Sequence, residues 1–228
     1  MIRLNRRLSI HTSYIAAKKA IRRLLREGGM DKHDITCLVV GLGNYGKERT
    51  RHSAGRLVVD SLAASLDLEW ERRREILGHV AELTTDDKRL LLLKPRLYMN
   101  ENGKSVAKAV KHFGVLPDDV FLVHDDLELP LGKCDIKMGG SARGHNGVRS
   151  TMTHLQSDKM GRLRFGIGRP ILKQHVTSYV LSEFDDTELS LVQATVQTSV
   201  ELLIMKFAHF IPQLKDSIHD DEHRREQK

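Results

Sequence analysis

The chain has 228 residues, of which 40% are hydrophobic, 29% charged and 5% aromatic, and its formal net charge is +7. This composition is that of a globular protein with a sizeable core, and it excludes an intrinsically disordered chain. No uncharged apolar run approaches the roughly 18 residues that a membrane-spanning helix needs. The two cysteines, Cys37 and Cys134, are far apart in the sequence, which supports neither a disulfide framework nor a zinc knuckle.

The positive charge is concentrated in the first 30 residues. This segment holds eight Lys and Arg residues against the single acid Glu27, so the rest of the chain is neutral overall. An Arg-rich, acid-poor leader containing Ser and Thr is typical of a mitochondrial presequence. We therefore expect residues 1–30 to be a basic leader of a mitochondrial protein. A basic arm that contacts RNA, or an ordinary helix in a cytoplasmic protein, is the alternative.

From residue 31 to residue 214 the pattern predicts a single compact domain, followed by a flexible charged tail at 215–228. Apolar runs predict strands at 35–40, 76–83, 89–94, 120–124, 133–138 and 163–167. Helical spacing predicts helices at 54–66, 106–113, 148–155 and 189–207, the first of them capped by Ser53. This alternation predicts an α/β fold, a single-domain three-layer sandwich with a mixed, largely parallel central sheet flanked by helices.

The segment GLGNYG at 41–46 matches the dinucleotide-binding pattern G-x-G-x-x-G directly after a predicted strand. The context does not fit this function. Residues 47–52 are polar without helical spacing, and no acid closes a second strand about 20 residues later. Alternatively, these glycines only allow the chain to turn tightly where it leaves the strand.

Polar residues gather at four predicted strand exits, where ligands of an α/β sheet bind. They are Asn44 with His52, Met99-Asn100, His124-Asp125-Asp126 and Gly144-His145-Asn146-Gly147. A histidine near a carboxylate is an arrangement for general-base catalysis, because the carboxylate fixes the tautomer and raises the pKa of the imidazole. The absence of a nucleophile elbow and of a well-placed Ser or Cys favours direct attack by water.

Each of these residues also has a structural interpretation. His52 is one of twelve histidines, and Asn44 and Asn100 are residue types that commonly form turns and caps. Asn146, beside glycines, can satisfy the backbone of its own loop. Metal catalysis also stays open, although the spacings match no zinc signature.

Together, the segments resemble the bacterial-type peptidyl-tRNA hydrolase family. The matching segments are VVGLGN at 39–44, TRH at 50–52, KP and YMN within 94–100, HD and LP within 124–130, GHNG at 144–147 and RLRFGIG at 162–168. The resemblance runs from about residue 35 to residue 210. It implies a monomeric enzyme, without metal or cofactor, that hydrolyses the ester between a peptide and the terminal ribose of tRNA. Its implied partner is peptidyl-tRNA, bound at the acceptor stem and 3′ end, and neither DNA nor a membrane.

The resemblance also implies roles for the residues that carry out the reaction. His52 is implied as the catalytic base, and Asp125 as the carboxylate that supports its basic form. Asn100 is implied as the amide near the ester, where it would donate to the developing oxyanion. Asn44 is implied to contact the peptide.

Further residues are implied to bind the tRNA. Asn146, with His145 beside it, would position water or the terminal adenosine. Tyr98 and Met99 would shape the site around the tRNA end. Lys137 and Arg164 would hold a phosphate on the acceptor side, as a local basic patch on a neutral domain.

The chain departs from the usual family pattern near Asn44. Tyr45 stands where a proline is usual, the loop before His52 is two residues shorter, and Ser53 replaces an asparagine. The short loop, Ser53 and the SAR segment at 141–143 resemble the eukaryotic branch, which favours an organellar leader. A non-catalytic RNA-binding relative acting in RNA processing is the alternative function, and the intact polar residues favour the enzyme.

Overall fold

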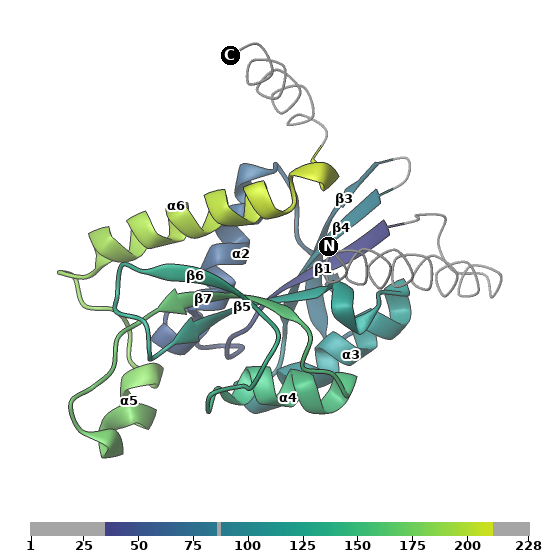
Figure 1. Ribbon diagram of the computed structural model, residues 1–228. Coiled ribbons are helices and arrows are strands. Elements are labelled where there is room, and N and C mark those ends of the chain that lie inside the picture. Colours follow the sequence, from purple (N-terminus) through teal and green to yellow (C-terminus); the bar gives the residue numbers. More distant parts are fainter. Residues whose placement is uncertain (1–34, 86–87, 212–228) are drawn as a thin grey trace, which may run out of the picture.

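The computed structural model describes residues 35–85 and 88–211 as one domain built around a seven-stranded sheet (Figure 1). The strands are β1 (Ile35–Gly41), β2 (Glu71–Arg73), β3 (Gly78–Thr84), β4 (Lys88–Pro95), β5 (Val120–Asp126), β6 (Cys134–Met138) and β7 (Gly161–Gly166). Their order in the sheet is β2-β3-β4-β1-β5-β7-β6. The four central strands are parallel, and antiparallel strands extend both edges. The predicted mixed, largely parallel sheet is confirmed.

Helices cover both faces of the sheet. The helices α2 (Ala54–Ser65) and α6 (Leu189–Lys206) lie on one face, and α3 (Asn102–Phe113) and α4 (Asn146–Leu155) lie on the other (Figure 1). The short helix α5 (Val176–Leu181) precedes α6. Five 3₁₀ turns complete the described elements: η1 (Arg51–Ser53), η2 (Met99–Glu101), η3 (Pro117–Asp119), η4 (Lys173–His175) and η5 (Ala208–Phe210). The three-layer sandwich is therefore also confirmed.

The central strands are nearly continuous apolar runs because helices cover them on both sides. In β1, Cys37 and Val39 pack into the layer of α2 and α6, whereas Leu38 and Val40 pack into the layer of α3 and α4. Every residue of β5 is buried, including the polar residues at its carboxyl end. The strand therefore carries a carboxylate, Asp125, into the interior of the protein.

The prediction that Ser53 caps α2 is wrong. A 3₁₀ turn precedes the helix, and the side chain of Ser53 makes no capping hydrogen bond. Its hydroxyl instead accepts from the backbone N–H of Asn44 at 3.1 Å and donates to the carbonyl oxygen of Lys47 at 2.8 Å. Ser53 thus holds the short loop after β1 against η1.

The predicted leader at 1–30 and tail at 215–228 lie outside the described residues and stay predictions. Among the residues described, no helix combines the length and apolar character needed to cross a membrane.

Gly55 allows α2 to begin in direct contact with β5. A Cβ atom at this position would lie 2.1 Å from the carbonyl oxygen of Val123 and 2.8 Å from that of Leu42. Because both atoms are backbone oxygens, one in β5 and one in the residue after β1, a side chain at this position would force α2 away from β5. The close approach brings η1, which precedes α2, to the carboxyl end of β5.

We expect Gly55→Ala to destabilise the protein by about 1–3 kcal/mol, because the added methyl group overpacks a rigid contact. Urea unfolding of both proteins measures the change. The matched control is Ala64→Ser on the exposed face of α2, which we expect to change the free energy of unfolding by less than about 0.5 kcal/mol. Equal effects of the two substitutions would contradict the account of Gly55.

Candidate functional site

A cavity of about 540 Å³ lies beyond the carboxyl end of β5. Its walls come from the loop after β1, the turns η1 and η2, the loop 139–147, strand β7 and helix α5. The predicted site residues that line it are Asn44, His52, Met99, Asn100, Asp125, Lys137, His145, Asn146 and Arg164. Tyr98 is not one of the lining residues, and it is 62% exposed. The fold thus brings together all but one of these residues.

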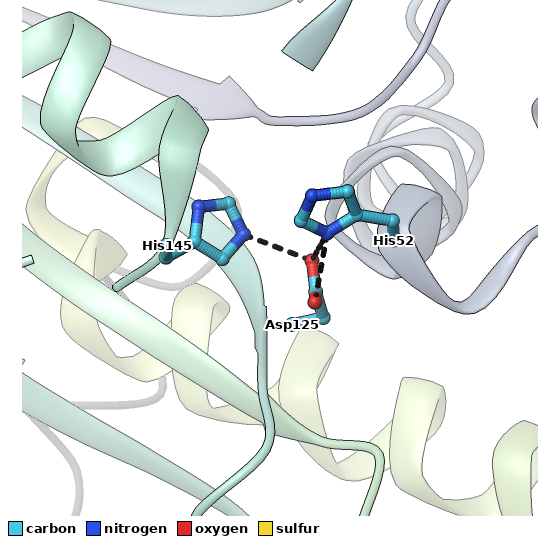
Figure 2. A group of neighbouring side chains, drawn as sticks. All are labelled: His52, Asp125 and His145. Atoms are coloured by element: carbon cyan, nitrogen blue, oxygen red, sulfur yellow. Dashed lines mark hydrogen bonds and ion pairs between the residues drawn. The ribbon is translucent and has the colours of Figure 1, made fainter. Parts of the chain in front are cut away.

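The centre of the site is the carboxylate of Asp125, which is only 2% exposed. Figure 2 shows two imidazole rings pointing at it, that of His52 from η1 and that of His145 from the start of α4. His52 Nδ1 lies 2.9 and 3.0 Å from the two carboxylate oxygens, and His145 Nε2 lies 2.9 Å from Oδ1. Both nitrogens donate, because an ionised carboxylate only accepts hydrogen bonds.

The second nitrogen distinguishes the two histidines. His145 caps α4, and its Nδ1 accepts the backbone N–H of Val148 at 3.2 Å. Both of its ring nitrogens are therefore occupied, with the proton on Nε2. His52 has no such second contact among the described residues, so its Nε2 keeps a free lone pair. Of the two rings, His52 is the one able to take a proton.

Burial and charge act against each other at this site. Burial alone would raise the pKa of Asp125, but the two rings and their hydrogen bonds outweigh it and hold this pKa well below its ordinary range. Burial alone would lower the pKa of His52, but the negative charge of Asp125 and its hydrogen bond outweigh it and raise this pKa above 6.5. A charged carboxylate thus supports a more basic imidazole.

His124 is a third histidine in the cavity wall, and it is not a base. Burial and then the neighbouring His145 ring lower the pKa of His124 to about 3. Its Nδ1 lies 2.6 Å from the carbonyl oxygen of Asp125, to which it donates. His124 is thus neutral near pH 7 and fixes the backbone at the end of β5.

Amide side chains line the other side of the cavity. Asn44 accepts the backbone N–H of Met99 through Oδ1 at 2.7 Å, which leaves its NH₂ group as a donor. Asn100 is exposed to the cavity, and its amide has no partner among the described residues. Asn146 accepts from Arg149 through Oδ1, so its NH₂ group is also available. The wall presents hydrogen-bond donors without adding charge.

Asn102 holds this wall together, and our sequence analysis did not identify it. Its fully buried amide bonds both backbone groups of Gly43 at 3.1 Å and donates to the carbonyl oxygen of Tyr98 at 2.8 Å. It therefore joins the loop that carries Asn44 to the turn that carries Asn100. The only sequence signal is a second asparagine two positions after Asn100.

Arg51 fixes the turn that carries His52 through contacts that no sequence pattern predicts. Its guanidinium pairs with both carboxylate oxygens of Glu188 at 3.0 and 2.5 Å and lies over the rings of Tyr179 and Phe184. Its backbone N–H donates to the carbonyl oxygen of Ser182 at 2.9 Å. Helix α5, which directly precedes Ser182, contributes the apolar side chains of Val176 and Val180 to the cavity wall.

His52, Asp125 and His145 are also of the residue types that bind zinc, and their ligand atoms lie within 4.8 Å of one another. The nitrogens that face Asp125, however, hold protons donated to it at 2.9–3.0 Å. A metal ion would have to displace both protons and their hydrogen bonds. The geometry therefore fits a site that handles protons better than a metal centre.

Comparison with known proteins gives consistent matches. The family model described as peptidyl-tRNA hydrolase matches residues 38–226. A mouse protein named "Probable peptidyl-tRNA hydrolase" is 44% identical over 73% of this chain and 83% of its own length, and the peptidyl-tRNA hydrolase of Moorella thermoacetica is 40% identical over 70% and 84%. A crystal structure of peptidyl-tRNA hydrolase from Acinetobacter baumannii has a TM-score of 0.69 at 31% identity and covers 78% of this chain and 94% of its own.

We expect Asp125→Asn to lower the pKa of His52 below its ordinary value, because burial then acts without the opposing negative charge. Titration of the imidazole nitrogens by NMR measures the shift. Asp67→Asn removes the same charge at an exposed position after α2, where the left-handed backbone tolerates asparagine, and should leave the His52 titration unchanged. An unaltered pKa in Asp125→Asn would contradict the assigned cause.

Proposed function

The chain belongs to the peptidyl-tRNA hydrolase family and is a hydrolase of peptidyl-tRNA; from this premise we propose that His52 is its general base. One observation carries the proposal. The buried Asp125 holds His52 by Nδ1, and the free lone pair on Nε2 belongs to a residue of the cavity wall. Of the other two histidines of this wall, His145 has both ring nitrogens engaged, and burial lowers the pKa of His124.

The proposed reaction begins with a water molecule bound to His52 Nε2. The imidazole takes a proton from this water, and the hydroxide attacks the carbonyl carbon of the ester. The resulting oxyanion accepts a hydrogen bond from the free amide of Asn100. The bond from the carbonyl carbon to the ribose oxygen then breaks, and the imidazolium returns its proton to that oxygen. Asp125 stabilises the imidazolium between the two proton transfers.

The remaining wall residues are proposed to hold the two ends of the substrate. The free NH₂ group of Asn44 suits a peptide carbonyl, next to the buried Met99. Asn146 and His145 lie at the start of α4, where they are proposed to position water or the terminal adenosine. Lys137 and Arg164 also line the cavity and are proposed to meet an acceptor phosphate. Tyr98 would contact the tRNA end outside the cavity.

Two further proposals concern the protein as a whole. The resemblance of the sequence to the family supports a monomeric enzyme. The Arg-rich, acid-poor leader supports action in mitochondria. Hydrolysis of peptidyl-tRNA that has left the ribosome prematurely would serve ribosome rescue there.

We expect His52→Ala to lower the rate of hydrolysis of an N-blocked aminoacyl-tRNA by roughly 10²–10⁴-fold while the protein stays folded, because the general base is lost. Release of the blocked amino acid measures the rate, and circular dichroism tests the fold. The control is His112→Ala on the exposed face of α3, which should retain wild-type activity. Activity of His52→Ala within twofold of the wild type would rule out the proposed base.

The mechanism predicts a pH dependence that the same assay measures. The base acts only when it is deprotonated, so kcat/KM should rise with pH to a plateau. The midpoint should lie above 6.5, because Asp125 raises the pKa of His52. In Asp125→Asn the midpoint should move to lower pH and the plateau should fall, since the imidazolium loses its stabilising charge. A wild-type midpoint below 6.5 would contradict this mechanism.

A further inference from the structure

Tyr45 and Arg96 lie directly beside the cavity wall that carries Asn44, although neither lines the cavity. The guanidinium of Arg96 lies over the Tyr45 ring, with Cζ 4.4 Å from the ring centroid, and donates a hydrogen bond to the Tyr45 hydroxyl. The backbone N–H of Tyr45 donates to the carbonyl oxygen of Leu97 at 3.1 Å. Leu97 comes two residues before Met99, whose backbone N–H Asn44 accepts. The stacked pair is therefore joined to the wall that presents the amides.

Arg96 belongs to a larger basic group on the strands β2, β3 and β4. The sheet register pairs Arg72 on β2 with His79 on β3, and His79 with Lys94 on β4, so these side chains form a row on one face of the sheet. Burial, and then the charges of Arg96, Lys94, Arg56 and Arg72, lower the pKa of His79. The positive charge thus extends from the carboxyl end of β4 to the edge strand. We call this row and the arginine that follows β4 the basic strip: Arg72, His79, Lys94 and Arg96.

Acids compensate only part of this charge. Lys94 pairs with Asp60 of α2. Arg56, which is buried beneath the strip, pairs with Glu48 at 3.6 Å. The two arginines of the strip, on β2 and directly after β4, pair with no acid in residues 35–85 and 88–211. The strip therefore keeps a net positive charge.

Both of these arginines are accessible to a ligand. Arg72 is exposed and Arg96 is half-buried. Glu71, the acid next to Arg72, points to the opposite face of β2, where it pairs with Arg73 at 2.7 Å. The face that carries the strip is thus open to an acidic ligand.

The place of the strip in the sheet indicates which part of the substrate it faces. Strands β4, β3 and β2 lead to one edge of the sheet, whereas β7 and β6 lead to the other (Figure 1). Lys137 and Arg164, which we propose to meet the tRNA, lie on β6 and β7. Asn44, which we propose to meet the peptide, lies beside the strip. A peptide that passes Asn44 and continues away from the tRNA therefore reaches Arg96 first.

We propose that the basic strip binds acidic side chains in the peptide part of peptidyl-tRNA, so that acidic peptides are cleaved more efficiently than basic ones. The inference rests on the proposed function for the position of the ester. Arg96 makes the strongest contact, because the Tyr45 ring holds its guanidinium in one orientation and a guanidinium can bind a carboxylate through two parallel hydrogen bonds. The strip touches no reacting atom, so its effect lies in KM and not in kcat.

The test compares three substrates of the full-length protein. Each is a tRNA that carries an N-acetylated tetrapeptide with alanine at the ester, preceded by three glutamates, three glutamines or three lysines. Release of the peptide at low salt gives kcat/KM. We expect the wild type to cleave the glutamate substrate at least about threefold more efficiently than the lysine substrate, which is the size of effect that exposed ion pairs produce. The preference should shrink as the salt concentration rises.

Three variants locate the preference. Arg96→Gln and Arg72→Gln should each bring the ratio of kcat/KM between the glutamate and lysine substrates closer to one, because each removes a cation of the strip. Lys111→Gln, the charge-matched control on the exposed face of α3, should keep the wild-type ratio. Equal kcat/KM for these two substrates in the wild type, or the wild-type ratio in both strip variants, would overturn the proposal.

Separate measurements distinguish this proposal from the proposed function and from a contact with RNA. Cleavage of the glutamine substrate, and its loss in His52→Ala, test the proposed function without reference to the strip. Weaker binding of uncharged tRNA by Arg96→Gln, measured by fluorescence anisotropy, would assign the strip to the nucleic acid and refute the contact with the peptide.

NMR decides the contact even where cleavage fails. The free acetylated glutamate peptide should shift the Nε–Hε signals of Arg96 and Arg72, which the two glutamine variants identify, and the lysine peptide should not. Unshifted arginine signals with the glutamate peptide would rule out the strip as its binding surface.

Discussion

The arrangement of the site depends on one buried charge, the carboxylate of Asp125. A carboxylate removed from water is strongly unfavourable unless partners compensate it. The compensation comes from two histidines on two other elements, η1 and the start of α4. Because α2 follows η1 on one face of the sheet and α4 covers the other, the carboxylate ties both helical layers to the central strand. Packing reinforces this link, since Gly55 lets α2 reach β5 and Gly147 leaves room for Met99.

The same carboxylate gives different roles to two chemically identical rings. His145 has both nitrogens occupied, one by Asp125 and one by the first turn of α4. His52 reaches Asp125 with Nδ1 and leaves Nε2 free. The first turn of α4 occupies the second nitrogen of His145, so this ring cannot act as a base. The 3₁₀ turn that carries His52 leaves Nε2 without a partner among the described residues, so this ring can. The difference arises from the backbone around each ring and not from the residue type.

Sequence reasoning succeeded where the causes are local. Apolar runs predict the central strands because burial on both faces requires them, and parallel strands bring their polar exits to one edge. Sequence reasoning failed where a side chain contacts a residue that is distant in the sequence. Arg51 contacts Glu188, 137 positions away, and Asn102 joins two loops through backbone groups that no pattern marks. Ser53 was misassigned because a 3₁₀ turn, absent from the helical pattern, uses its hydroxyl for the neighbouring loop.

The cavity wall also carries several cations, which come from β6, β7, the loop 139–147 and the segment 169–173. A cation near His52 would oppose formation of the imidazolium, but the pKa of His52 is set by burial and by Asp125. Asp126, the next residue of β5, pairs with Arg164 at 3.2 Å. Adjacent aspartates on one strand therefore have different partners, because the first supports a base between two imidazoles and the second neutralises a guanidinium.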